Sequence, residues 1–173
     1  MTHILIRCNA TPPRTIWDLA RTIWPHPPHL WPEISLGTIL GCGSLSLDNE
    51  RPRRDQPRRE HLPQEHAPKG AMRLLQILVT ESAYLIWVLR CERTIQERSH
   101  SIDEIHHRWF CSINARLTED KITATKIKRD KRTTQKVKDT WEHVLRNQMD
   151  LPNDWITSRE VLVGRRARRA LPL

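Results

Sequence analysis

The chain has 173 residues, with 29 Lys and Arg against 20 Asp and Glu, which gives a formal net charge of +9, and 38% of its residues are hydrophobic. Average globular proteins are roughly 45–50% apolar, so we expect a small core beneath a basic surface. This composition excludes a collagen, a disulfide-rich scaffold and a multi-span membrane protein.

Local composition divides the chain into four parts. Residues 48–69 contain four Pro, eleven charged residues and only two apolar ones, and such a segment cannot bury enough surface to offset the entropy of ordering. We therefore predict a disordered linker there, between residues 1–47 and a helical bundle over residues 70–164, with a basic tail over residues 165–173. A piece of about 47 residues seldom folds alone, so we expect residues 1–47 to be loosely held.

The first part contains one clear helix signal. Thr11 can cap a helix in which Pro12 and Pro13 occupy the first turn, and apolar residues follow at helical spacing until Pro25. The glycine-rich run over residues 34–47 is equally compatible with a short helix and an irregular loop. We interpret its glycines as tight turns rather than a phosphate cradle, because no strand or Lys-Ser/Thr pair accompanies them.

Residues 70–164 are predicted to be almost entirely helical. A long central helix begins at Ala71 and reaches about Arg98; polar residues interrupt its apolar run, so we interpret it as the buried helix of a soluble protein rather than a membrane span. Ser101 and Glu104 form a capping box that opens the next helix, and Thr118 is expected to open a weaker one. The apolar stripes of the last two long helices are Ile102, Ile105, Trp109, Ile113 and Leu117, and then Val137, Trp141, Val144, Leu145 and Met149.

The fold class is therefore mostly α, a helical bundle with a long central helix. We expect Trp87, Trp109 and Trp141 to hold the bundle together. A segment containing Trp155 is expected to cover its end, and Glu81 to pair with a basic residue of another helix.

Residues 121–138 hold eight bases and one acid and are the main source of the positive charge. A strip of this kind repels itself unless anions neutralise it, and phosphate backbones do so with release of counterions. It contains no aromatic side chain, so only sequence-independent nucleic-acid contact is expected. A solvated surface and a nuclear-import signal are the alternatives. The expected phosphate contacts are Lys126, Lys128, Arg129, Lys131, Arg132, Lys136 and Lys138.

Two His–Cys pairs have spacings that metal sites use. His3 and Cys8 form an H-x4-C pair, which can supply half of a tetrahedral zinc site, but the chain has no C-x-x-C for the other half. His107 and Cys111 are four residues apart; we expect a packed cysteine with exposed histidines, including His100, rather than a metal site. No nucleophile, base and orienting group occur at a recognisable spacing, so we expect no enzyme activity.

Several words of the sequence are similar to one family. The H-x4-C pair, TIWDLARTIWP, SLGTILGCGSL, ESAYLIWVLRCER and EIHHRWFCSINARLTEDKITATKIK resemble the C-terminal region of reverse-transcriptase polyproteins of fungal non-LTR, LINE-like retrotransposons, over roughly residues 3–164. In that family an RNA-directed DNA polymerase, often with a ribonuclease H domain, precedes a zinc-binding segment that ends in H-x4-C. The resemblance implies that His3 and Cys8 are zinc ligands and that residues 1–47 are a truncated remnant of that segment.

The same resemblance sets the expected function. The paired aspartates of the polymerase and the carboxylates of the ribonuclease H are absent, so it implies a non-catalytic, nucleic-acid-associated C-terminal fragment of the polyprotein. Its expected partners are nucleic acid and the polyprotein, with no membrane, and its expected location is nuclear or cytoplasmic. The alternatives are a helical module that docks on the polymerase or ribonuclease H part, and a decayed open reading frame without function.

Overall fold

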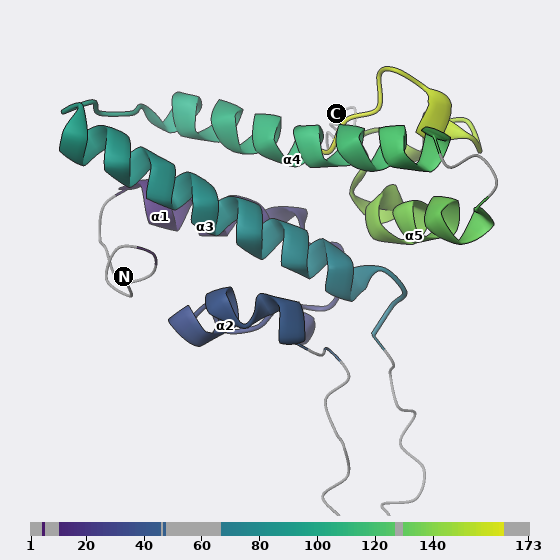
Figure 1. Cartoon of the computed structure of the whole chain (residues 1–173), viewed down its shortest axis with the longest axis horizontal. Helices are drawn as coiled ribbons and strands as arrows, with labels where there is room; N and C mark the ends of the chain where they lie inside the picture. Colours follow the sequence, from purple (N-terminus) through teal and green to yellow (C-terminus); the bar gives the residue numbers. More distant parts are fainter. Residues whose placement is uncertain (1–4, 6–10, 46, 48–66, 127–129, 165–173) are drawn as a thin grey trace, which may run out of the picture.

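The computed structural model describes residues 5, 11–45, 47, 67–126 and 130–164. Within these residues the chain is helical, without strands, and the predicted mostly α fold is confirmed. Figure 1 shows the order of the elements. The α-helices are α1 (Thr11–Ile23), α2 (Leu36–Leu40), α3 (Ala71–Ile95), α4 (Ile102–Lys126) and α5 (Lys131–Trp141); the 3-10 helices are η2 (Pro28–Leu30), η3 (Cys42–Ser44), η4 (Glu142–Val144), η5 (Gln148–Asp150) and η6 (Trp155–Thr157).

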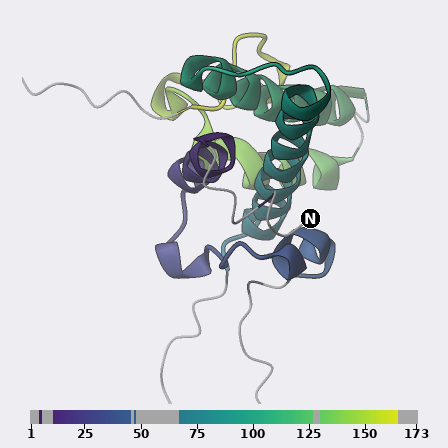
Figure 2. The same ribbon diagram turned by 90° about the vertical axis from the view of Figure 1, so that its left-hand side faces the viewer.

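Helices α3 and α4 form the frame of the bundle. They are antiparallel neighbours joined by a short turn, α1 packs against both of them, and α5 packs beneath the C-terminal end of α4 (Figure 1). Seen from the side, α1 and α3 lie next to each other under α4, with α2 farther down (Figure 2). The residues after α5 return over α4, which η6 contacts.

A single hydrophobic core contains residues from before and from after the predicted linker. Ile16, Trp24 and Trp31 are buried in the same cluster as Trp109 and Trp141. The prediction that residues 1–47 are loosely held is therefore wrong for their described part, because α1 packs against both α3 and α4 and its apolar face is buried in the common core.

Two of the three tryptophans expected to hold the bundle do so. Trp109 and Trp141 are fully buried, whereas Trp87 is 42% exposed on α3. The indole Nε1 of Trp109 donates to the buried hydroxyl of Ser82, 3.0 Å away. This hydrogen bond joins α4 to α3 inside the core.

Helix α4 is longer than its capping residues predict. Ser101 accepts a hydrogen bond from the backbone N–H of Glu104 at 3.1 Å, as its predicted cap requires. Thr118 starts no new helix, because its hydroxyl donates to the backbone carbonyl of Asn114 within α4. Ile102 is 53% exposed, so the buried stripe of α4 begins one turn later than expected.

The last predicted helix ends early. α5 stops at Trp141, and a short 3-10 turn follows. Asn147 then adopts a left-handed backbone conformation with φ of 55°, which a continuing helix excludes. Met149 is consequently 76% exposed instead of buried.

The turn between α3 and α4 is fixed by charges around His100. This imidazole is buried, contrary to the expected exposure, and lies 3.0 Å from Glu92 and 3.1 Å from Glu104. Arg108 donates two hydrogen bonds to Glu92, at 2.6 and 2.8 Å, and these bonds lower the pKa of Glu92 below its ordinary value. The cluster clamps the end of α3 onto the start of α4.

Glu81 finds the partner that the sequence predicts. Its carboxylate lies 3.4 Å from Nε of Arg116 on α4. Burial raises the pKa of Glu81, and the Arg116 charge opposes that rise.

Helix α3 is long and apolar enough to cross a membrane by length and composition, and half of its most apolar window is buried in the bundle. This burial is compatible with the core helix of a soluble protein.

Asp120 on α4 joins three helices. Arg73 on α3 donates two hydrogen bonds of 2.7 Å to its carboxylate, and Nε1 of Trp141 on α5 donates a third at 2.6 Å. Burial alone would raise the pKa of Asp120, but these donors hold it below its ordinary value. Because Arg73 lies on α3 and Trp141 on α5, this mostly buried carboxylate keeps all three hydrogen bonds only while the three helices stay together.

Gly70 sets the approach of α3 to α5. Its φ is +80°, in the left-handed region that favours glycine. A Cβ atom here would lie 2.1 Å from the backbone carbonyl oxygen of Asp139, which is far inside van der Waals contact. Glycine therefore allows the start of α3 to touch the last turn of α5.

We expect Asp120→Asn to lower the free energy of unfolding by about 2–4 kcal/mol, because it removes a partly buried charge from Arg73. The matched control is Asp18→Asn, since the Asp18–Arg14 pair is exposed on both sides and such pairs contribute little. Urea unfolding measures the free energy of unfolding of both variants.

The stability that Asp120 contributes should depend on pH. The ionised Asp120 stabilises the fold above its ordinary pKa of 3.8, and this contribution is lost as pH falls through the lower pKa of the folded state. The wild type should therefore lose more stability than Asp120→Asn below about pH 4.

We expect Gly70→Ala to destabilise the protein by at least about 2 kcal/mol, because the strain of a positive φ adds to the clash with Asp139. Gly43→Ala is the control, since a Cβ there meets no atom within 4 Å. Thermal unfolding of the two variants tests the claim; equal melting temperatures would contradict it.

Candidate nucleic-acid interface

The basic strip is divided between two helices. α4 ends at Lys126 and α5 begins at Lys131, after the N-cap residue Asp130. Lys128 and Arg129 lie outside the described residues. The strip is therefore a junction between helices and not one continuous helical face.

Asp130 fixes where α5 begins. Its carboxylate accepts hydrogen bonds from the Thr133 hydroxyl at 2.6 Å and from the backbone N–H of Arg132 at 2.9 Å. These hydrogen bonds lower the pKa of Asp130, and the bond from the Thr133 hydroxyl has the largest effect, so the carboxylate stays ionised as a cap. The cap places Lys131 and Arg132 in the first turn, where the helix dipole disfavours a cation and favours a bound anion.

Four of the described cations of the strip are exposed and have no acidic partner among the described residues. Several arginines elsewhere are paired with carboxylates, among them Arg73, Arg108 and Arg116. Within the described part of the chain, no lysine forms an ion pair, and neither does Arg132. The exposed members of the strip that the structure places at the junction are Lys126, Lys131, Arg132 and Lys136.

Two lysines at the edge of the strip hold the C-terminal segment. Nζ of Lys138 donates to the backbone carbonyl of Asn153 at 2.9 Å, and Nζ of Lys121 donates to that of Ser158. Burial lowers the pKa of Lys121. The sequence shows these lysines only as charges, and their carbonyl partners come from a segment without a regular helical pattern.

Acidic side chains border the strip at the other end of α5. Asp139 accepts a hydrogen bond of 2.7 Å from Gln135, and Glu142 is exposed one turn after Lys138. The unpaired positive charge is therefore concentrated at the first half of α5 and the end of α4.

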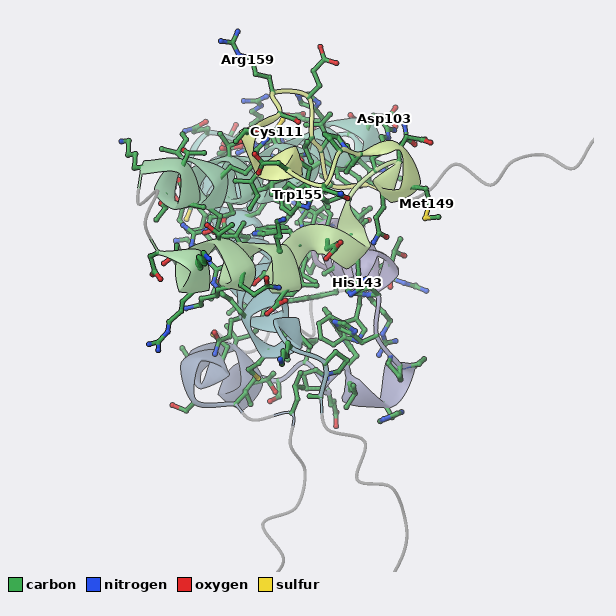
Figure 3. All side chains as sticks on the ribbon, turned by 90° about the vertical axis from the view of Figure 1, so that its right-hand side faces the viewer. Asp103, Cys111, His143, Met149, Trp155 and Arg159 are labelled. Carbon is green, nitrogen blue, oxygen red and sulfur yellow. The ribbon has the colours of Figure 1, made fainter. Side chains whose placement is uncertain are left out.

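A cavity of about 420 Å³ opens between α5 and the segment that carries η5 and η6. Figure 3 shows this side of the molecule, with Trp155 above α5 and Met149 and His143 towards its C-terminal end. The sequence predicts that the segment with Trp155 covers the end of the bundle, but no motif or periodic pattern in it predicts a cavity. The lining residues are Lys138, Glu142, Leu145, Gln148, Met149, Leu151, Pro152, Asn153 and Trp155.

The candidate metal ligands do not form a described site. His3 and Cys8 lie outside the described residues. Sγ of Cys111 lies 3.5 Å from Nε2 of His107, and both side chains are exposed, so the expected packing of Cys111 is wrong. The parts of the chain that the structure describes contain no group of three or more His, Cys, Asp or Glu side chains that could hold a metal.

The other cysteines and the glycine run have structural positions. Cys42 is buried in the core and Cys91 is half-buried. The run over residues 34–47 folds as α2 followed by η3, which is the short-helix alternative. A Cβ on Gly41 would lie 2.9 Å from the carbonyl oxygen of Gly37, so a tight turn explains this glycine.

Comparison with known proteins adds no family to this description. No protein-family model, curated protein or solved structure matches the chain. The observations that bear on function are the side chains exposed on the described surface and the sequence motifs quoted above.

Proposed function

We propose that the protein is a nucleic-acid-associated module that contacts the phosphate backbone without sequence preference, through the strip at the junction of α4 and α5. One observation carries this proposal: Lys126, Lys131, Arg132 and Lys136 are exposed and have no acidic partner among the described residues. Clustered unpaired cations repel one another, and phosphates remove that repulsion while releasing counterions.

The scaffold beneath the strip supports the same function. The Asp130 cap and the contacts of Asp120 hold α5 in a fixed place against α3 and α4. The cations are thus presented from rigid helices. By sequence, Lys128 and Arg129 join the two helices and add two further positive charges. Lysine and arginine side chains bound to phosphates position a protein on nucleic acid but read no bases.

The resemblance in the sequence extends this proposal to a biological setting. We infer a non-catalytic C-terminal region of a retrotransposon reverse-transcriptase polyprotein. In that setting the strip would keep the polyprotein on its RNA or DNA, while the polymerase part carries the chemistry.

Binding to mixed-sequence duplex should fall steeply as salt rises from about 50 to 200 mM, with a slope of log Kobs against log salt near −0.9 for each neutralised phosphate. Fluorescence anisotropy measures the slope. The double variant Lys131→Gln, Lys136→Gln should bring the slope about 2 units closer to zero. Its control is Arg90→Gln, Arg93→Gln, which removes the same charge from exposed positions on α3. A flat salt dependence, or equal effects of the two double variants, would exclude the strip as the interface.

A docking module on the polymerase part is the second candidate function. Tyr84, Trp87 and Ile95 are 66%, 42% and 78% exposed on one side of α3, and such apolar side chains favour a protein partner. Charge reversal at Lys126, Lys128 and Arg129 separates the two functions. It should abolish phosphate contact and leave docking through α3 intact.

A further inference from the structure

The cavity beside α5 has the size and the chemistry to hold one small polar ligand. Its volume is about 420 Å³, within the range of roughly 300–1,000 Å³ that small-molecule sites occupy. Its lining combines apolar groups, among them Leu145 and Pro152, with polar groups from α5 and from the segment before η6.

Trp155 supplies an aromatic side chain to the lining of the cavity. Only 4% of the residue is exposed. Its Nε1 is buried and has no acceptor in the described part of the chain, so the indole offers a ligand an apolar surface and not a hydrogen-bond donor.

Four further polar side chains define the class of ligand. Lys138 supplies a cation, because its Nζ donates only to the Asn153 carbonyl and forms no ion pair in the described residues. Gln148 and Asn153 supply carboxamides, which can pair with the edge of a base in two directions. Glu142 also lines the cavity and favours a ligand that turns a donor, such as a base amino group, towards it.

Met149 adds an apolar surface beside these groups. Its side chain is 76% exposed and lies with Trp155 on the face shown in Figure 3. A polarisable thioether packs well against an aromatic ring. A cation, two carboxamides and an apolar surface together match a phosphate joined to a base.

We propose that this cavity binds a single nucleotide unit, with its phosphate at Lys138 and its base among Trp155, Met149 and the two carboxamides. This inference rests on the proposed function, because the nucleotide belongs to a strand that lies along the strip.

The geometry of α5 connects the cavity to the strip. Lys131 and Lys138 are seven residues apart, and at 1.5 Å per residue this separation is about 10 Å along one helix face. Successive phosphates of one helical strand are about 3.4 Å apart along its axis. A strand bound at Lys131 therefore reaches the mouth of the cavity within a few nucleotides and can place an unstacked base there.

Titration of the full chain with adenosine monophosphate tests the cavity directly, using the indole N–H resonances of the seven tryptophans. The signal that is missing in Trp155→Phe belongs to Trp155. We expect this signal to shift on addition of the nucleotide, and to shift less with adenosine or with inorganic phosphate at the same concentration. Lys138→Gln should weaken nucleotide binding, followed by the Trp155 signal, about 5–10-fold through the loss of one charge.

The controls separate the cavity from the strip. Lys136→Gln lies on the same helix outside the cavity, so it should weaken duplex binding and leave nucleotide binding unchanged. Trp87→Phe alters an exposed indole elsewhere and should change neither. If the Trp155 signal is unmoved by nucleotide up to about 10 mM, or if phosphate alone reproduces its shift, the nucleotide site is excluded. Steep salt-dependent duplex binding would then still stand, whereas its loss with an intact Trp155 response would exclude the strip and keep the cavity.

Discussion

The arrangement of the bundle depends on the hydrogen bonds that the Asp120 carboxylate accepts. This carboxylate is a largely buried charge, and Arg73 and Trp141 satisfy it from two different helices. A buried charge that lost either donor would be strongly unfavourable, so α5 can occupy only one place against α3 and α4. The strip and the cavity are both built on α5, and their geometry follows from this one group.

Several arginines and lysines of the described chain make different kinds of contact. Arginine forms bidentate pairs with carboxylates, and here arginines close the contacts between helices, as at Asp120 and Glu92. Lysines remain at the surface or donate to backbone carbonyls, as Lys138 does. Three of the four exposed, unpaired cations at the junction of α4 and α5 are lysines, which suit contacts with phosphates in many registers.

Local signals in the sequence predict the helices better than they predict the packing. The apolar periodicity and the capping residues predict α1, α3 and the start of α4. Glu81 is the one acid in the most apolar run, and this isolation correctly predicts a basic partner. The burial of Trp24 could not be predicted, since an amphipathic helix shows that it has an apolar face but not which surface covers it. Thr118 looks like a cap only because its alternative, a hydrogen bond to the preceding turn, leaves no trace in the sequence. The cavity depends on the irregular path after Asn147, where no periodic pattern exists.

The hydrogen bond between Ser82 and Trp109 has a consequence for the alignment of the two longest helices. Apolar faces alone would tolerate sliding of α3 along α4, because leucine and isoleucine contacts are much alike at every turn. A slide of one turn, about 5.4 Å, would leave the indole N–H of Trp109 facing hydrocarbon without an acceptor. The hydroxyl of Ser82 thus selects a single register in an otherwise apolar contact between the two helices. A Ser82→Ala change would loosen the alignment of the helices before it unfolded the protein.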